Sequence, residues 1–250
     1  MINIRKLIGS CNHVAQYDLR DFKGRLFVVS DLHGHYELLH EKLREVAFDY
    51  NTDLLFVLGD WTDRGPDSRY VLDYVNERWI HSLQGNHERM FIEGFESHWH
   101  PNNRSVLTLK AHGGDWIWNS GLTDLDKILI HDAFTSMPLG MELLLSNDRK
   151  VGMIHAEVPY NDWNKWLNIT KAELEWDGMA TAQWARTWYS TRYQGTVAGV
   201  DCVLVGHTPT DSGNVEQYGN MVFIDGGSFF NDRINFVELT DEFVRSVKCL

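Results

Sequence analysis

The segment VLGDWTDRGPDS, residues 57–68, decides how the rest of the sequence is interpreted. It continues the apolar run 54–58, which is typical of a strand buried on both faces, and then breaks at a glycine. Two carboxylates and a guanidinium follow at once, from Asp60, Asp63 and Arg64. Ligand crevices of open α/β sheets form at the carboxyl ends of strands, so we expect Asp60 at the floor of a cleft. Taken alone, the segment is equally compatible with a turn that carries a solvated ion pair.

The composition is that of an ordinary globular protein and argues against several functions. A chain of 250 residues, 43% hydrophobic and 23% charged, can bury a full core. No apolar run approaches the ~18 residues of a membrane span, and residues 1–13 do not resemble a secretory signal. We therefore expect a cytoplasmic protein with no membrane partner. The net charge of −12, with no basic block, argues against nucleic acid as a partner.

The cysteines predict no cross-link. There are three, Cys11, Cys202 and Cys249, and no pair of them has the CxxC spacing. We interpret them as buried or incidental thiols, not as a disulfide framework or a zinc-thiolate site.

Alternation of apolar strands with amphipathic helices predicts one α/β domain over residues 1–250. We predict strands at 25–30, 54–58, 80–84, 141–145, 151–154, 202–205, 221–224 and 234–239, with 243–248 as a candidate partner of the last. We predict helices at 36–48, 68–79, 123–136 and 180–191, and another from the GNHE segment to residue 95. Residues 1–24 are interpreted as a peripheral lead-in, 112–118 as a turn into an aromatic packing segment, and 156–180 as an irregular connection over the active face.

Five strand ends share one arrangement, in which a short polar loop with metal-type ligands follows the strand. They are SDLHGH, GDWTDRG, GNHE, HAE and GHTP, which carry Asp31, His33, Asp60, Asn86, His87, His155 and His207. A single histidine at a strand end is more often structural, but five such loops point into one crevice. Oxygen and imidazole donors without thiolate suit Mn²⁺, Fe²⁺ or Zn²⁺. So many ligands fit two ions ~3.5–4 Å apart that share a carboxylate.

A two-metal site of this kind predicts phosphoryl transfer, because two cations neutralise a phosphate and lower the pKa of a water molecule. The reaction also needs positive charge on the equatorial oxygens and a proton for the leaving oxygen. Arg64 can supply the charge, and His87 can supply the proton. Asp63 stands where it can orient the His87 imidazole.

The order of the five motifs resembles that of the calcineurin-like metallophosphoesterases, in the phosphoprotein phosphatase branch, over residues 25–230. The resemblance implies a single domain in which two mixed β-sheets pack as a sandwich flanked by helices, with the metal site at the strand C-termini. It implies that one ion is held by Asp31, His33 and Asp60, and a second by Asp60, Asn86, His155 and His207. Asp60 would be the bridge, and Mn²⁺ the expected metal, with iron or zinc as alternatives.

The same resemblance gives roles to the remaining residues. His87 would be the general acid and Asp63 its partner, while Arg64 and Arg186 would clamp the phosphate, with Arg192 as the alternative to Arg186. The chain departs from the family pattern in three places: Ser30 stands where a glycine is usual, GDxVDRG reads GDWTDRG, and the HAD or HGG motif reads HAEVP. None of these changes removes a ligand, and the glutamate of HAEVP bears on the rim of the pocket.

Three functions compete on this basis. The leading hypothesis is a dimetal phosphomonoesterase acting on phosphoserine, phosphothreonine and possible phosphotyrosine side chains. Hydrolysis of dinucleoside polyphosphates is an alternative, because such enzymes share every motif named above. A non-catalytic scaffold is expected to lose the acid and the clamp, whereas this chain keeps His87 and Arg64.

Overall fold

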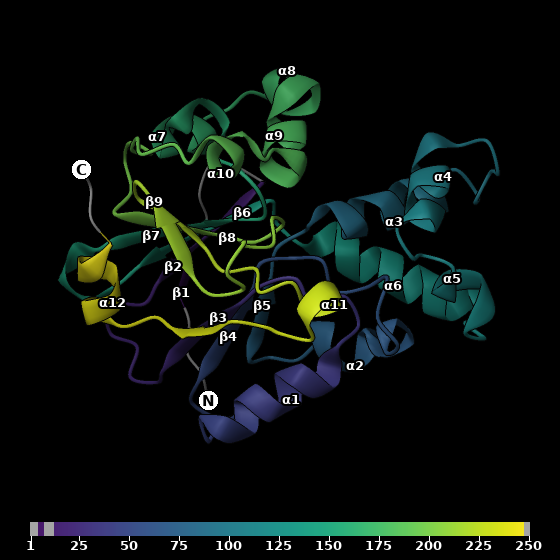
Figure 1. Ribbon diagram of the computed structural model, residues 1–250, viewed down its shortest axis with the longest axis horizontal. Helices are drawn as coiled ribbons and strands as arrows, with labels where there is room; N and C mark the ends of the chain where they lie inside the picture. Colours follow the sequence, from purple (N-terminus) through teal and green to yellow (C-terminus); the bar gives the residue numbers. More distant parts are fainter. Residues whose placement is uncertain (1–4, 8–12, 248–250) are drawn as a thin grey trace.

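Two β-sheets form the centre of the computed structural model, which describes residues 5–7 and 13–247 (Figure 1). The larger sheet has the order β1-β2-β6-β7-β8-β10-β9, with strands β1 Arg5–Leu7, β2 Val14–Asp18, β6 Gly140–Leu144, β7 Lys150–Ile154, β8 Cys202–Val205, β9 Glu216–Tyr218 and β10 Met221–Phe223. The smaller has the order β11-β3-β4-β5, with strands β3 Leu26–Val29, β4 Leu54–Val57, β5 Ile80–Ser82 and β11 Phe236–Glu238. Each sheet contains both parallel and antiparallel pairs, so both are mixed.

Apolar side chains fill the space between the two sheets. Tyr17 of β2 and Leu204 of β8 belong to one buried cluster with Val28 of β3 and Phe56 of β4. The opposite faces of β3 and β4 are buried as well, since all four residues of each strand are buried. Strands covered on both faces need apolar residues at every position, which is why these segments lack alternation.

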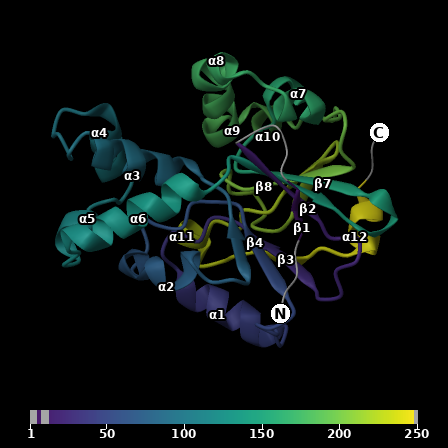
Figure 2. The ribbon, with the colours of Figure 1, turned by 180° about the vertical axis from the view of Figure 1, so that it is seen from behind.

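Helices cover the outer face of each sheet (Figures 1 and 2). They are α1 Tyr36–Glu45, α2 Leu72–Val75, α3 Asn86–Glu96, α4 Arg104–Ala111, α5 Trp116–Asn119, α6 Asp124–Ser136, α7 Trp163–Leu167, α8 Lys171–Glu173, α9 Met179–Trp184, α10 Thr187–Thr191, α11 Ser228–Asn231 and α12 Asp241–Ser246. Leu39 of α1 and Phe134 of α6 pack in the cluster outside the smaller sheet, and Trp163 of α7 packs outside the larger one. The predicted sandwich of two mixed sheets flanked by helices is therefore confirmed.

One helix prediction is also confirmed, and the cysteines and helix lengths can be described. The predicted helix 123–136 is present as α6, and a capping box begins it: the side chains of Thr123 and Asp126 each accept from the other residue's backbone. The side chain of Cys202 is buried in the core, while Cys11 and Cys249 lie outside the described residues. None of the described helices is long and apolar enough to cross a membrane.

The prediction of a peripheral lead-in is wrong for strand β2. Val14–Asp18 pairs in parallel with β6, Gly140–Leu144, inside the larger sheet, and Val14 and Tyr17 are buried. The partner strand is more than a hundred residues away: Gln16 and Glu142, which face each other in the register, are separated by 126 positions. No local pattern can reveal such a pairing.

Three further elements differ from their predictions. Most of the candidate strand 243–248 is instead helical: residues 243–246 lie in α12, which Thr240 caps by accepting from the Phe243 amide, and residue 248 lies outside the described residues. The predicted helix 180–191 divides into α9 and α10, since Ala185 takes an extended conformation with ψ of 145°. In place of the predicted helix 68–79, the structure has a 3₁₀ turn, Ser68–Tyr70, followed by the single turn of α2.

Candidate active site

Five strands from both sheets bring the predicted site residues to one edge of the sandwich. The loops after β3 and β4 carry Asp31, His33 and Asp60, and the first turn of α3, which follows β5, carries Asn86 and His87. The loops after β7 and β8 carry His155 and His207. All seven side chains are buried. The two sheets contribute different sides of the site, because the first five residues follow the smaller sheet and the two others follow the larger one.

The Asp60 carboxylate lies at the centre of this group. Its Oδ2 is 3.7 Å from Nε2 of His33 and 3.9 Å from Nε2 of His87, and its Oδ1 is 3.5 Å from Nε2 of His155. Two donor groups share it, His33–Asp60–His87 and Asp60–His155–His207, and within each group the ligand atoms lie within 4.8 Å of one another. Asp60 is thus placed where a carboxylate could bridge two ions.

The orientation of the imidazoles fits metal binding. Nδ1 of His33 donates to the Thr62 carbonyl at 3.0 Å, and Nδ1 of His155 donates to the Leu58 carbonyl at 2.7 Å. A carbonyl only accepts, so each Nδ1 carries the hydrogen and each Nε2 faces Asp60. Metal-binding histidines are commonly fixed in this way by a backbone carbonyl on the other ring nitrogen.

The groups around Nε2 of His155 favour a bound cation. Its Nε2 lies 2.9 Å from Oδ1 of Asn86 and 3.5 Å from Oδ1 of Asp60, and these oxygens only accept hydrogen bonds. Burial lowers the pKa of His155, but Asp60, Asp31 and the Leu58 carbonyl together outweigh burial and raise the pKa to about 10. A proton or a metal ion at this position would satisfy all three groups. The donor set therefore fits a divalent cation.

Asp31 lies beside these donor groups but belongs to neither of them. Its two carboxylate oxygens accept from the backbone N–H of His207 at 2.9 Å, and one also accepts from the Ser30 hydroxyl. A Cβ on Gly206 would lie 2.4 Å from Oδ2 of Asp31, so only glycine fits there. Ser30, which stands where a glycine is usual, therefore donates a hydrogen bond to Asp31. The role of Asp31 as a metal ligand stays a prediction.

His87 and Asp63 form a buried pair that Trp116 completes. Nδ1 of His87 lies 2.5 Å from Oδ2 of Asp63, and Nε1 of Trp116 donates to the other carboxylate oxygen at 2.5 Å. Burial lowers the pKa of His87, but Asp60 and Asp63 together outweigh it, so the pKa lies above its usual value. By distance alone His87 could be a metal ligand. Its pairing with Asp63 equally allows it to hold a proton at Nε2, facing the site.

The two predicted clamp arginines lie on different sides of the site. The Arg64 guanidinium is 3.0 Å from Nε2 of His33 and 3.2 Å from Nε2 of His87. Arg186 is exposed and lies directly before α10. Burial and the positive charges of His155 and Arg186 lower the pKa of His207 to about 2. The alternative, Arg192, forms an ion pair of 3.0 Å with Asp211.

The backbone of the site loops is strained. Positive φ angles occur at His33 (45°), Asp60 (54°), Asp63 (73°), Arg64 (70°) and His207 (63°). Residues with a Cβ rarely adopt this region, and each such residue costs about 1–3 kcal/mol that the surrounding structure must offset. Strain of this kind gathers at functional sites, so it supports a shaped site and not five incidental turns.

The sequence interpretation missed Glu88, which holds the Asp60 loop in place. Its buried carboxylate accepts from the backbone N–H of Asp60, Trp61 and Gly85 at 2.9, 2.9 and 2.8 Å. Burial and the charge of Asp60 raise the pKa of Glu88 to about 7. The signal was present, since Glu88 is the last residue of the GNHE motif. Trp116 was also missed, because the segment 112–118 was interpreted as packing.

Comparison with known proteins agrees with this geometry. The profile of the calcineurin-like phosphoesterases matches residues 24–233. Serine/threonine-protein phosphatase 2 of Escherichia coli K12 is 32% identical over 218 residues, covering 86% of this chain and 92% of the relative. A symmetrical bis(5'-nucleosyl)-tetraphosphatase of Buchnera aphidicola is 32% identical over 95 residues, 36% of this chain and 34% of the relative.

A solved protein serine/threonine phosphatase from Saccharomyces cerevisiae shares the fold, with a TM-score of 0.56 at 16% identity, covering 83% of this chain and 69% of that one. The profile match covers most of the chain, and the Asp and His donors expected of a dimetal site are present within it. The chain belongs to the calcineurin-like phosphoesterases.

Proposed function

We propose that this protein is a metal-dependent phosphomonoesterase that hydrolyses phosphoserine and phosphothreonine in proteins. The observation that carries the proposal is the position of Asp60, between imidazoles from two sheets and next to the His87–Asp63 pair and Arg64. The Asp60 carboxylate is therefore surrounded by a positive group that can bind a phosphate, Arg64, and by a proton donor for the leaving oxygen, His87.

The metal ligands are proposed as two sets that share Asp60. One ion would be held by Asp31, His33 and Asp60, and the other by Asp60, Asn86, His155 and His207. Mn²⁺ is the expected metal, with iron or zinc as alternatives. When bound, two such ions neutralise the phosphate and lower the pKa of a water molecule near it.

The other residues act on the phosphate and on the leaving group. Arg64 and Arg186 bind phosphate oxygens by charge-assisted hydrogen bonds and orient the phosphorus for attack by water. As the bond between phosphorus and the ester oxygen breaks, Nε2 of His87 gives its proton to that oxygen, so the products are phosphate and the free hydroxyl side chain. Asp63 holds the opposite ring nitrogen of His87 and stabilises its protonated form.

A protein substrate is favoured by the relatives that match over most of the chain, which are named serine/threonine-protein phosphatases. Dinucleoside tetraphosphate hydrolysis is the second candidate, and it is favoured by relatives of that name that match over a shorter stretch. A scaffold without activity is the least supported, because His87, Asp63 and Arg64 remain in mutual contact. The cytoplasmic location stays a prediction from the sequence.

The test is a substrate panel. The protein is treated with a chelator, dialysed, and assayed after adding Mn²⁺, Fe²⁺ or Zn²⁺ separately. Phosphoserine and phosphothreonine peptides, a phosphotyrosine peptide, diadenosine tetraphosphate and p-nitrophenyl phosphate are compared by kcat/KM. We expect activity only with metal, highest with Mn²⁺ and higher on the phosphopeptides than on diadenosine tetraphosphate. The reverse order of substrates would replace the proposal with its alternative, and activity undiminished by chelation would contradict it.

A further inference from the structure

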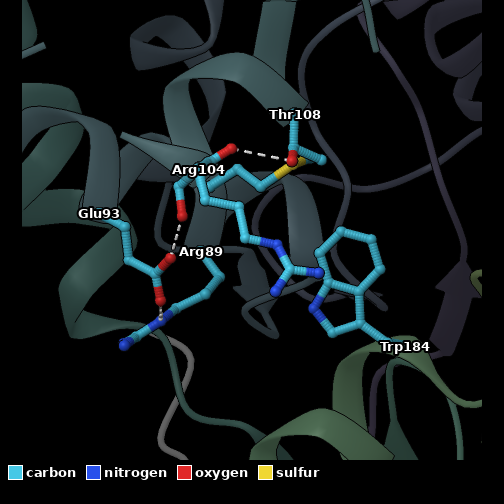
Figure 3. Close-up of a pocket in the computed structure, with 7 residues that line it drawn as sticks. Arg89, Glu93, Arg104, Thr108 and Trp184 are labelled. Atoms are coloured by element: carbon cyan, nitrogen blue, oxygen red, sulfur yellow. Dashed lines mark hydrogen bonds and ion pairs between the residues drawn. The ribbon is translucent and has the colours of Figure 1, made fainter. Parts of the chain in front are cut away.

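A pocket opens beside the candidate active site, between α3, α4 and the end of α9. It has a volume of about 420 Å³ and is lined by Arg89, Met90, Glu93, Arg104, Ser105, Thr108 and Trp184 (Figure 3). This volume is in the range of pockets that hold small ligands. None of its lining residues has a role in the chemistry proposed above.

Two residues that line the pocket lie close to residues of the site. Trp184 contributes its indole to the pocket, while its backbone carbonyl lies 3.3 Å from Nε2 of His207. Met90 lies one helical turn after Asn86 on α3. A group held at the phosphate position would therefore have its neighbouring atoms beside this pocket.

The charges that line the pocket leave an excess of one positive charge. Arg89 donates to Glu93 at 2.6 Å, and the second Glu93 oxygen accepts from the Ser105 hydroxyl, so the Glu93 carboxylate is satisfied. Among the described residues, no carboxylate forms an ion pair with Arg104. Figure 3 shows the Arg104 side chain and the Trp184 indole pointing toward each other across the pocket. On a chain with a net charge of −12, this unpaired guanidinium marks a place for an anion.

The pocket also has an apolar part. Trp184 is 41% exposed, although tryptophan side chains are on average largely buried. Met90 is buried and forms the floor of the pocket. A group with a short apolar stem and an anionic end would cover the indole and reach Arg104. Aspartate and glutamate side chains have this form.

We propose that this pocket binds the carboxylate side chain of a residue next to the phosphorylated residue, so that the enzyme prefers acidic phosphopeptides. The proposal rests on the proposed protein phosphatase function. Arg104 and Trp184 bind the substrate in this scheme and take no part in the chemical step. The preference therefore appears in KM more than in kcat.

The test compares two phosphopeptides that differ only in their neighbouring residues, glutamate in one and alanine in the other, with p-nitrophenyl phosphate as a substrate too small to reach the pocket. We expect the wild-type protein to favour the glutamate peptide. Arg104→Ala should reduce this preference about fivefold, the size of one partly exposed ion pair, and Arg104→Glu should invert it. Activity on p-nitrophenyl phosphate should stay unchanged, and the preference should weaken as salt is raised.

Arg104→Glu is a mild change for the fold. Residue 104 is exposed and opens α4 directly after its cap, Asn103, where a negative side chain interacts favourably with the helix. The matched control is Arg78→Glu, because Arg78 is also exposed but does not line the pocket. The control should keep the wild-type preference.

The outcomes separate the pocket from the function. Equal peptide preference in the wild type and in Arg104→Glu, with all substrates hydrolysed, would overturn the pocket proposal and leave the phosphatase function standing. If Arg104→Glu lost activity only on diadenosine tetraphosphate, the pocket proposal would also be overturned, and the pocket would be assigned to nucleotide binding. No hydrolysis of either peptide by the wild type, with p-nitrophenyl phosphate still hydrolysed, would instead remove the protein phosphatase function on which the proposal rests.

Discussion

The two sides of the candidate site are built in opposite ways. On one side, the ligand residues that follow the strands of both sheets are buried, those after β3, β4 and β8 include strained residues, and Glu88 alone accepts three backbone N–H groups. On the other side, the segment from α9 to α10 exposes Trp184 and Arg186. The first side fixes charges in place, and the second presents side chains to solvent.

This difference suggests a division of work. Preorganised, desolvated groups are suited to metal binding and proton transfer, because they need no rearrangement during the reaction. Exposed side chains are suited to contacts with the rest of the substrate. Substitutions on the first side should therefore change metal content or kcat, and substitutions on the second side should change how the substrate is held.

Asp60→Asn should have the largest effect, because Asp60 is the proposed ligand of both ions. The amide removes the negative charge that three imidazoles face. We expect both metals to bind more weakly and kcat to fall by at least about 10³-fold. Metal analysis after dialysis, together with kcat, measures both effects. Two ions bound with undiminished affinity would refute the bridging role of Asp60.

His87→Asn should separate proton transfer from metal binding on the same side of the site. A general acid contributes about 10²–10⁴-fold, and least when the leaving oxygen is already a stable anion. We expect such a loss in kcat on a phosphoserine peptide and a much smaller loss on dinitrophenyl phosphate, with metal content unchanged. Equal losses on both substrates would mean that His87 positions the phosphate or water, and loss of a metal ion would make it a ligand.

Arg64→Lys and Arg186→Lys compare the two sides directly. Each change removes a forked donor while keeping the positive charge. If both arginines bind the phosphate, each variant should lose about 10–10²-fold in kcat/KM and keep its metals. Arg192→Ala is the control, because Arg192 is paired with Asp211. Unchanged kinetics in Arg186→Ala would exclude Arg186 from the clamp, and a loss in the control would transfer the role to Arg192.

Trp116→Phe should have the smallest of these effects. It removes the N–H that donates to Asp63 but keeps an aromatic ring in the cluster. An unsatisfied buried acceptor costs about 1–3 kcal/mol, so we expect roughly a tenfold loss in kcat on phosphoserine peptides. Trp118→Phe is the matched control, since Trp118 is a neighbouring exposed indole. An effect of equal size in the control would show that the loss comes from packing of the helix.

Much of the fold was predictable from sequence, because buried strands and capped helices leave local signals. The apolar runs of β3, β4 and β8 and the capping box of α6 are examples. The place of β2 was not predictable, because its partner lies 126 positions away. The break between α9 and α10 was also missed: an extended Ala185 is set by tertiary contacts, and alanine itself favours helix.

In the candidate site too, residues whose role depends on a contact distant in sequence could not be predicted. Acidic and histidine residues at strand ends could be found by type and position, and the structure brings Asp60, His33, His87, His155 and His207 together. Trp116 could not be found in this way, since tryptophan is usually a packing residue and its partner Asp63 is 53 positions earlier. Its role follows only from the contact.

The parallel pairing of β2 with β6 has a consequence for synthesis. Strand β2 leaves the ribosome before β6, which follows about 126 residues later, roughly 6–25 s at usual rates of elongation. Within the described chain, β2 has only the three-residue β1 as an earlier partner, and a two-stranded hairpin is marginal in water. The nascent chain thus carries an apolar strand with an open edge while β3, β4 and β5 can already assemble. Such an edge favours contact with other chains, so slowing elongation between residues 18 and 140 should increase aggregation or chaperone capture of the newly made protein.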